Sequence, residues 1–506
     1  MRTWSTWWAA TTGGRTLAVF VSSTERPTGK SPVRSEVLSA TFVGLASLAV
    51  YVLTLAPTVA TNDAGRFQIS APLLGTGHPT GYPTFILFGK LFTFLPLGDV
   101  AYRVSLMAAV FGAGAAVLAY LVARSIGARQ TPAVGAALIF AFSTTFWSQA
   151  TLGEVYTMHA FFVLLVTLLL LRWREEGGMI SLLSAAFVFG VSLGNNAGMV
   201  LFAPMFVILF FTKGKRRVTV RRTLAGGIVF LGGLSVYAYI PLRGFAGAWH
   251  NYGDPVNNWS EVWAVISGSR FQGLMDPTPG TVLGNVGGFL AQFSAQAPAP
   301  FGYGLLALLL VGGLGGAAAL FARDKAVAMA IFAGLLAALV YALSYEIDDI
   351  AVYYIPVYMI LCLLLAVGIT EAGNRMAVLQ PLFLAPVIVA ALVLGLNFAP
   401  SDRSDYYDER ARSEDILETL PEGAILYGKV EIIPVTYLVE VEDERPDVTL
   451  RWLDGGTLKE NFERDLTSER PVYFISHESC DDDYLPATEE FAASEEEGDL
   501  IYFEPR

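Results

Sequence analysis

The side chains of this sequence that could do chemistry gather in a few short loops between long apolar segments. The first loop reads Asn62-Asp63-Ala64-Gly65-Arg66 and continues as Gly77-His78-Pro79-Thr80. It brings together a carboxylate that could accept a proton and a guanidinium and an imidazole that could bind a phosphate. These residue types predict acid–base chemistry on a phosphorylated compound.

Two carboxylates are candidates for the proton acceptor. Asp63 follows the first apolar segment by a few residues, where partial desolvation would raise its basicity. Its alternative role is to cap a helix that begins near Gly65. Glu154 lies in a short loop between two apolar segments, and ionisable groups held at that depth are functional candidates. Its alternative role is to support the N-terminus of the following helix.

Three further residues are candidate phosphate ligands. His78 lies in a rigid turn with two prolines, where it could also simply bond to the backbone. Arg243 ends an apolar segment, and its planar fork suits a phosphate, with snorkelling toward lipid head groups as the alternative. Arg103 is the third candidate. We expect no cofactor, although a divalent metal ion stays open.

Residues suited to a sugar follow later in the chain. Asp254 and Trp259 belong to an amide- and aromatic-rich stretch that could stack on sugar rings, and Asn195 lies in a turn that it could merely stabilise. Asp348 stands between two other acids, Glu346 and Asp349. This trio could bind a divalent cation through its oxygens, or it could be a solvated loop.

The elements that must position these residues are membrane spans. With 15% charged residues and a mean hydropathy of +0.51, the chain predicts a polytopic membrane protein, since about 20 apolar residues cross a bilayer. Eleven such segments are expected, at about 37–56, 102–123, 131–148, 157–172, 180–194, 197–212, 223–242, 301–322, 326–343, 352–370 and 378–397.

Positive charge predicts the orientation of these spans. Alternate loops, counted from the N-terminus, hold 18 of the lysines and arginines, whereas the opposite loops before the tail hold five. Loops rich in positive charge stay in the cytoplasm. We therefore expect a multi-pass protein of a bacterial plasma (inner) membrane, with a cytoplasmic N-terminus and an extracytoplasmic tail. The candidate site residues then all lie on the outside.

Three regions are expected along the chain. Residues 1–35 are read as a disordered leader, and residues 36–400 as the transmembrane domain, with long outside loops at 57–101 and 243–300. Residues 401–506 carry 30 acidic and 10 basic side chains, a net charge of −20, which argues against nucleic acid as a partner.

The tail alternates strand-like and helix-like runs and so predicts a small soluble α/β domain. Its strands are expected at Ala424–Tyr427, Val448–Trp452 and Val472–Ile475, and its helices near Glu431–Val441 and Thr457–Asp465. The acidic runs 481–483 and 495–497 are interpreted as solvated surface.

In several motifs the chain resembles the protein O-mannosyltransferase-like membrane family, formerly a domain of unknown function, within the GT-C glycosyltransferase superfamily. The resemblance covers roughly residues 40–475. It rests on Asp63-Ala64-Gly65, His78-Pro79-Thr80-Gly81-Tyr82-Pro83, Ala101-Tyr102-Arg103-Val104, Phe146-Trp147-Ser148-Gln149, Glu154-Val155-Tyr156, Gly190-Val191-Ser192-Leu193-Gly194-Asn195, Tyr239-Ile240-Pro241-Leu242-Arg243, Gly253-Asp254-Pro255, Asp348-Asp349-Ile350-Ala351-Val352-Tyr353-Tyr354-Ile355-Pro356 and Arg445-Pro446-Asp447.

The resemblance implies a GT-C-like fold whose first outside loop forms part of the active site, with Asp63 as base and Glu154 as a second acid. It also places Tyr82, Tyr156 and Tyr353 among the substrate-binding residues. One position departs from the family, because Arg66 stands where a glutamate is common. Arg66 could add to the charge that binds phosphate, or the change could alter the activity or the acceptor.

The combined reading is an integral-membrane glycosyltransferase. It would move a sugar, with inversion, from a polyprenyl-phosphate donor to a hydroxyl of a protein or glycan at the outer leaflet, with membrane lipid as its other partner. The alternative is a polytopic transporter or a flippase for lipid-linked glycans. A transporter would need acids at mid-span, and the spans hold few.

Overall fold

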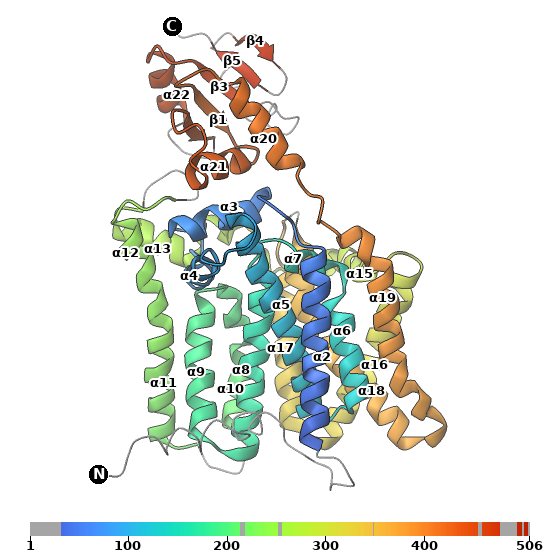
Figure 1. Ribbon diagram of the computed structural model, residues 1–506. Helices are drawn as coiled ribbons and strands as arrows, with labels where there is room; N and C mark the ends of the chain where they lie inside the picture. Colours follow the sequence, from blue (N-terminus) through green and yellow to red (C-terminus); the bar gives the residue numbers. More distant parts are fainter. Residues whose placement is uncertain are drawn as a thin grey trace, which may run out of the picture.

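Long helices stand side by side in a bundle, and a small sheet domain lies over one end of it (Figure 1). The computed structural model describes residues 32–212, 218–250, 256–347, 349–453, 458–475, 493–497 and 500–503. The predicted leader, 1–35, falls outside these ranges except for its last four residues. Those four residues belong to the first described helix, α2 (Pro32–Leu53), so this helix begins before the predicted end of the leader.

Each of the eleven predicted apolar segments coincides with helical structure. Among the described residues, eight helices are long and apolar enough to cross a membrane, and the bent pair α6 and α7 raises the number to nine. These spans are α2 (Pro32–Leu53), α5 (Val100–Ser125), α6 (Gln130–Ala141) with α7 (Thr144–Ala150), α8 (Tyr156–Glu176), α11 (Val220–Leu234) with η3 (Ser235–Ala238) and α12 (Tyr239–Gly244), α16 (Phe301–Arg323), α17 (Lys325–Leu343), η5 (Ile350–Tyr354) with α18 (Ile355–Arg375), and η6 (Ala377–Leu384) with α19 (Ala385–Ser401).

The other two predicted segments form shorter apolar helices. They are α9 (Met179–Leu193), and η2 (Ala197–Phe202) continued by α10 (Ala203–Phe211). Both stand in the bundle near α8 (Figure 1). The predicted number of spans therefore depends on whether helices of this length are counted.

Small residues allow the helices of the bundle to approach closely. At the contact between α16 and α18, a Cβ added to Gly316 would lie 1.9 Å from the carbonyl oxygen of Leu364, and one added to Gly368 would lie 2.2 Å from that of Gly312. Only glycine fits these positions without a shift of the backbone. Such small-residue contacts are the usual way for helices to pack in lipid, where burial of apolar surface supplies little drive.

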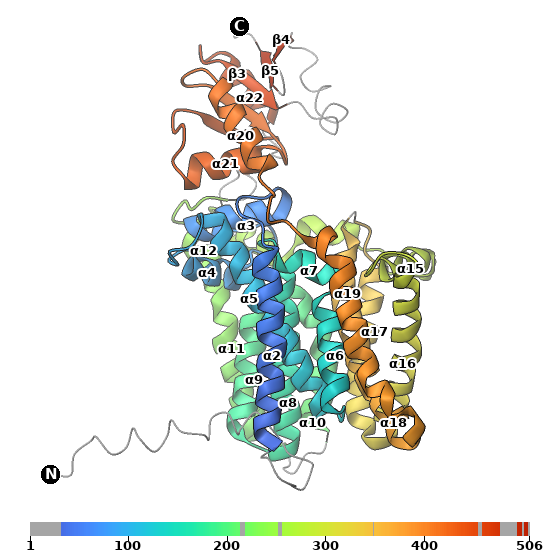
Figure 2. The ribbon, with the colours of Figure 1, turned by 45° about the vertical axis from the view of Figure 1, so that its right-hand side comes forward.

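The two long loops fold into short helices at the end of the bundle that faces the sheet domain (Figure 1, Figure 2). The first loop contains α3 (Asn62–Leu73) and α4 (Pro83–Phe92). The second contains α13 (Trp259–Ser267), η4 (Ser269–Leu274), α14 (Pro279–Gly284) and α15 (Val286–Ser294). Helices α4 and α13 coincide with two stretches of these loops, 85–94 and 259–266, in which the sequence shows an amphipathic pattern.

The C-terminal domain is the predicted α/β unit, built on a five-stranded sheet. Strands β2, β1 and β3 run parallel, and β5 and β4 continue the sheet in antiparallel fashion, in the order β2-β1-β3-β5-β4. The elements are α20 (Asp408–Thr419), β1 (Ile425–Gly428), α21 (Ile432–Val441), β2 (Thr449–Trp452), α22 (Leu458–Leu466), β3 (Val472–Ile475), β4 (Ala493–Glu497) and β5 (Leu500–Phe503). Strands β4 and β5 were not predicted from the sequence. The acidic run 495–497, interpreted as solvated surface, belongs to β4.

The sheet domain packs directly on α3. Ile433 of α21 contacts Gly65, where an added Cβ would lie 2.6 Å from the Ile433 side chain. Val59 and Ile69 share one apolar cluster with the buried residues of α21. The hydroxyl of Tyr437 accepts a hydrogen bond from the backbone N–H of Ala101. This docking holds α3, which carries Asp63 and Arg66, between the bundle and the sheet domain.

The opposite end of the bundle holds arginine ion pairs between helix ends. Arg124 pairs with Glu36, Arg174 with Asp324, and Arg323 with Glu371. These arginines belong to the loops that the charge count assigns to the cytoplasm. The structure thus separates the basic loops from the end that carries α3 and the sheet domain (Figure 2).

Candidate functional site

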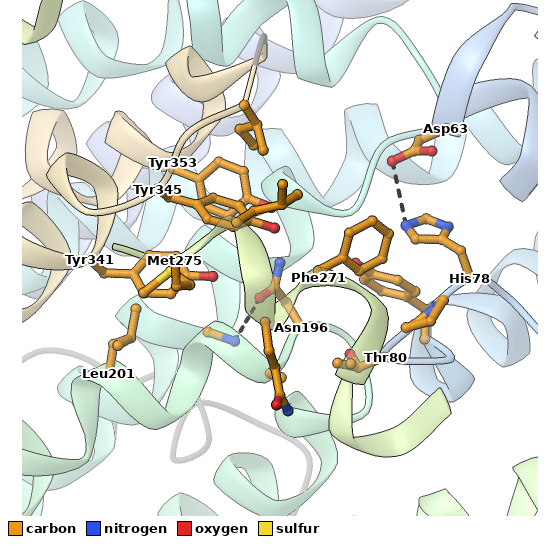
Figure 3. Close-up of a pocket in the computed structure, with 18 of the residues that line it drawn as sticks. Asp63, His78, Thr80, Asn196, Leu201, Phe271, Met275, Tyr341, Tyr345 and Tyr353 are labelled. Atoms are coloured by element: carbon orange, nitrogen blue, oxygen red, sulfur yellow. Dashed lines mark hydrogen bonds and ion pairs between the residues drawn. The ribbon is translucent and has the colours of Figure 1, made fainter. Parts of the chain in front are cut away.

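A cavity of about 460 Å³ lies at the end of the bundle beneath the sheet domain. Its walls come from α3, the loop before α4, the start of α8, η2, the α13–η4 turn, and the segment that joins α17 to η5. Figure 3 shows Asp63 and His78 on one side of it and Tyr341, Tyr345 and Tyr353 on the other. The predicted site residues that line the cavity are Asp63, Arg66, His78, Tyr82, Tyr156 and Tyr353.

Asp63 and His78 face each other at the edge of the cavity. The Asp63 carboxylate lies 3.4 Å from Nε2 of His78, and its side chain is 48% exposed. Asp63 is the second residue of α3, and the N-cap position belongs to Thr61. The predicted alternative, in which Asp63 caps a helix beginning near Gly65, is therefore wrong. The carboxylate is open to a ligand and has an imidazole beside it.

Aromatic rings hold His78 in place. Its ring centroid lies 4.7 Å from that of Tyr82 and 5.2 Å from that of Phe67. This burial lowers the pKa of His78, while the nearby Asp63 carboxylate raises it and Arg66 lowers it further. The net shift is downward, so the imidazole is largely neutral at pH 7. It can then orient the Asp63 carboxylate by a hydrogen bond.

Glu154 lies behind this pair, in the buried turn between α7 and α8. Burial raises its pKa well above the usual range, and the negative charges of Asp63 and Asp349 raise it further. Its carboxyl group accepts hydrogen bonds from the backbone amides of Val155 and Ala64. Ala64 follows Asp63 in the first turn of α3, where backbone N–H groups have no partner within the helix. Glu154 thus ties the start of α8 to the residue next to Asp63.

Arg66 is buried between the cavity and the sheet domain. Its guanidinium carbon lies 5.1 Å from the centre of the Trp452 ring on β2, within the range of a cation–π contact. Its side chain also lines the cavity. The residue that departs from the family pattern therefore joins the sheet domain to the candidate site and places a permanent positive charge there.

Tyrosine side chains form the wall opposite Asp63. Tyr353 lies at their centre, with ring centroids 5.8 Å from Tyr156, 5.8 Å from Tyr341 and 5.2 Å from Tyr345. The last two were missed from the sequence, because they sit at the end of an apolar segment and belong to no motif. Also missed were Thr80, Asn196, Phe271, Gln272 and Met275, which line the cavity as well.

The structure places Arg243 and Arg103 away from the cavity lining. The Arg243 guanidinium donates to the carbonyls of Leu74 and Leu73, at the C-terminal end of α3. Asp63 is ten residues earlier, about 15 Å along the same helix. Arg243, predicted as a phosphate ligand, therefore does not share a cavity with Asp63, because it donates to carbonyls at the negative end of the helix dipole.

Arg103 is likewise engaged by the backbone. Its guanidinium donates to the carbonyls of Leu97, Thr93 and Gly98. It orders the loop between α4 and α5 rather than facing a ligand. The reason is general: loop carbonyls near a cation compete with any phosphate for its donors, and a sequence does not reveal which one is closer.

Of the four other predicted residues, the structure describes two. Asn195 is buried outside the cavity lining and donates to the carbonyl of Val155, which supports the turn after Glu154. Trp259 starts α13, is 70% exposed and contacts the ring of Phe245. Asp254 and Asp348 lie outside the described residues.

The predicted cation site at 346–349 includes one residue that is not described. Asp349 lines the cavity, whereas Glu346 is not among the lining residues. Within the described ranges, no three acidic, histidine or cysteine side chains are grouped so as to hold a metal ion. Among the described residues that line the cavity, Arg66 supplies the positive charge.

Comparisons of sequence identify relatives of part of the chain. The model of the Protein O-mannosyl-transferase TMEM260 N-terminal domain matches residues 63–219. Protein O-mannosyl-transferase TMEM260 of Mus musculus is 33% identical over 226 residues, which are 43% of this chain and 32% of that protein. The Dictyostelium discoideum protein of the same name is 30% identical over 123 residues, 24% of this chain and 15% of that one. The chain thus matches about a third or less of the length of these relatives.

Solved structures share the fold over most of the chain. ArnT from Cupriavidus metallidurans bound to undecaprenyl phosphate superposes with a TM-score of 0.58 at 12% identity, over 93% of this chain and 97% of that one. The Archaeoglobus fulgidus oligosaccharyltransferase in its apo form gives 0.53 at 13% identity, over 89% and 70%. The sequence matches confirm the predicted resemblance to the O-mannosyltransferase-like family over part of the chain, and the structural matches show that the chain shares the fold of these two proteins.

Proposed function

We propose that this protein is a membrane glycosyltransferase that moves a sugar from a polyprenyl-phosphate donor to a hydroxyl group of a protein or glycan. The observation that carries the proposal is the Asp63–His78 pair in the wall of a cavity that also presents Arg66. The names of the sequence relatives and the lipid phosphate bound by a fold neighbour support the same reaction.

In the proposed reaction, Asp63 is the base. The acceptor oxygen attacks the anomeric carbon from the face opposite the phosphate, its proton passes to the Asp63 carboxylate, and the bond between that carbon and the phosphate oxygen breaks. The products are the inverted glycoside and the free polyprenyl phosphate. A positioned base of this kind contributes roughly 10²–10⁴-fold to a rate.

Arg66 and His78 are the proposed partners of the phosphate. The guanidinium of Arg66 stabilises the charge that grows on the leaving phosphate. The neutral imidazole of His78 carries a single N–H; on Nε2 this group either donates to the Asp63 carboxylate or turns to the bound phosphate. Since this proposal takes its positive charge from Arg66, we expect transfer to survive chelation of divalent metal by EDTA.

Glu154 is proposed as a positioning residue. Burial and the neighbouring carboxylates raise its pKa and so favour the protonated form, which is poorly suited to accept a proton. Its bonds to Ala64 and Val155 instead hold the start of α3 against the start of α8. That contact determines where the Asp63 carboxylate lies.

We further propose that the cavity opens on the extracytoplasmic side of a bacterial plasma membrane. The arginine ion pairs at the far end of the bundle support this orientation through the charge rule. The transporter alternative is less well supported, because Asp63 and Glu154 lie at the ends of spans rather than at their centres.

The proposal is tested by reconstitution into liposomes with undecaprenyl phosphomannose as donor and a serine- and threonine-containing acceptor domain. We expect Asp63→Asn to lower kcat by about 10²–10⁴-fold while the protein inserts normally. Asp405→Asn is the matched control, because Asp405 is exposed and does not line the cavity. Transfer at the wild-type rate by Asp63→Asn would remove Asp63 from the mechanism.

A further inference from the structure

The C-terminal sheet has a free edge at β2. In the strand order β2-β1-β3-β5-β4, β2 is the outermost of the parallel strands and pairs with β1. All four of its residues, 449–452, are partly exposed. Natural sheets usually protect such an edge with a proline, a bulge or a covering segment. Strand β2 contains no proline and no break in register, and no strand in the described part of the chain pairs with its outer side.

Two residues of β2 direct their backbone groups to this edge. The N–H groups of Thr449 and Leu453 donate to carbonyls on the side of β1. A strand bonds to each neighbour through alternate residues, so the N–H and C=O groups of Leu450 and Trp452 point away from β1. Among the described residues, no backbone group bonds to Leu450 or Trp452 on that side. Such a row of unpaired groups is a template for another strand.

The edge leads to the candidate site. Trp452 is the last residue of β2, and its ring centre lies 5.1 Å from the guanidinium carbon of Arg66, which lines the large cavity. Asp63 is three residues earlier on α3, about 4.5 Å along the helix axis. A segment that pairs with β2 and continues past Trp452 is therefore directed toward the cavity.

The distance from the edge to Asp63 is short. The contact between Trp452 and Arg66, one side chain and one helical turn together span on the order of 10–17 Å. An extended chain advances about 3.3 Å per residue, so about three to five residues cover this distance. One continuous peptide can thus pair with β2 and still place a side chain beside Asp63.

The backbone groups at the edge determine which chemistry fits them. A polypeptide in the extended conformation offers N–H and C=O groups with the same repeat, and its addition to a free edge is a recurring mode of peptide recognition. A glycan carries hydroxyl groups on rings and has no such repeat. Of the two acceptor classes in the proposed function, the edge of β2 therefore suits the polypeptide.

We propose that the free edge of β2 binds the acceptor polypeptide as an added strand and so presents one of its serine or threonine hydroxyls to Asp63. This inference rests on the proposed function and adds the surface that binds the acceptor and the conformation that the acceptor adopts there. The acceptor residue lies in an extended segment, about three to five residues from the part that pairs with β2. The sheet domain is then the docking module for the acceptor.

The test uses synthetic peptides with a single threonine between two flanks, in the reconstituted enzyme with undecaprenyl phosphomannose. Each peptide of the series carries one N-methylated amide, which deletes one N–H donor. With wild-type protein, the KM for the peptide should rise by about 2- to 10-fold, the effect of one lost hydrogen bond, at alternate positions on one flank. The positions between them should have the KM of the parent peptide, because their N–H groups point away from β2.

Leu450→Pro and Leu450→Ala are the matched variants of the enzyme. Both shorten the side chain, but the proline alone removes the N–H group at the edge, and edge strands tolerate proline. The KM for the parent peptide should be about 2- to 10-fold higher for Leu450→Pro than for Leu450→Ala.

The inference is overturned if N-methylation has no alternating effect, or if wild-type protein glycosylates a glycan or a folded domain but none of the peptides. It is also overturned if the edge pairs with a second copy of the chain, so that Leu450→Pro converts a dimer to a monomer and leaves the KM for the peptide at that of Leu450→Ala. Absence of transfer to every acceptor by wild-type protein would instead overturn the proposed function, and the inference with it.

Discussion

Replacing Glu154 separates a positioning role from a role as base. Glutamine has the shape of the protonated carboxyl group, and its oxygen can still accept from the amides of Ala64 and Val155. Alanine leaves both amides buried without a partner. We therefore expect Glu154→Gln to be mild and Glu154→Ala to be severe, whereas a residue that must be ionised would lose its function in either variant.

The magnitudes follow from the contacts. Each orphaned amide costs about 1–3 kcal/mol, so Glu154→Ala should lose about 2–6 kcal/mol of stability. The misplaced Asp63 should lower kcat by about 10²-fold, the usual effect of a shift of about 1 Å at a reacting group. Glu154→Gln should stay within about tenfold of the wild-type rate.

The raised pKa of Glu154 determines whether the free energy of unfolding rises or falls with pH. The folded protein binds the Glu154 proton more tightly than the unfolded chain does. This contribution to stability is complete at low pH and falls by about 1.4 kcal/mol per pH unit as the pH rises above about 4.3, the ordinary glutamate pKa, until it reaches the folded pKa. Glu154→Gln carries no such proton and should lack this slope.

The assay is thermal unfolding in detergent from pH 5 to pH 8, together with transfer rates in liposomes. Glu418→Gln is the control, because Glu418 is exposed on α20 and should keep the wild-type slope. The reasoning would be refuted if Glu154→Gln inactivated the enzyme as thoroughly as Glu154→Ala. A wild-type slope retained in Glu154→Gln would refute the attribution of that slope to Glu154.

Three further predictions concern the surroundings of Asp63. Trp452→Ala should lower kcat/KM for the lipid donor by about 2- to 30-fold, because it removes the cation–π contact with Arg66. Trp452→Phe retains an aromatic ring and should keep most of the activity. Equal rates for the two variants would contradict the role of the ring. Arg243→Met should lower the free energy of unfolding by about 1.5–3 kcal/mol, because the hydrogen bonds to α3 are lost, and it should leave the KM for the donor unchanged. A large rise in that KM would instead show that Arg243 binds the phosphate of the donor. Because the pKa of buried His78 is lowered, its own contribution to stability should fall as the pH drops below about 6.5, where the unfolded chain takes up the proton first; this slope is opposite in sign to that of Glu154. The difference in unfolding free energy between the wild type and His78→Gln should therefore change with pH in this range, and a constant difference would contradict the role of His78.

The sequence predicted the bundle well because hydropathy is a local signal. All eleven apolar segments match helices, and the three strands and two helices predicted for the C-terminal domain lie within one or two residues of their observed positions, although α20 was not predicted. It failed at β4, where glutamates at 495–497 belong to a strand of the sheet. Acidic residues are depleted in strands, so neither composition nor alternation predicts that strand.

The candidate site was predicted in part, and the errors share a cause. Asp63, His78, Tyr82 and Tyr156 line one cavity, as the motifs imply. Arg243 was counted as a ligand because it stands at a span end, although the bonds that hold it are made to α3, some 170 residues earlier. Contacts over such separations depend on how the loops pack.

Tyr341 and the Arg66–Trp452 contact were not predicted from the sequence, because they too depend on contacts between distant parts of the chain. Tyr341 ends an apolar segment and looks like any interfacial aromatic residue, yet its ring lies 5.8 Å from Tyr353 in the cavity wall. Trp452 lies in the C-terminal domain, and only the docking of that domain on α3 brings it to Arg66. No local pattern in the sequence connects these residues.

The most direct measurement is a cryo-EM structure of Asp63→Asn protein bound to undecaprenyl phosphomannose. The account predicts phosphate density beside Arg66 and His78, with the sugar over the tyrosine wall and the substituted side chain at position 63 within hydrogen-bonding distance of the acceptor path. Phosphate density at the other end of the bundle, near Arg174 and Arg323, would contradict the account.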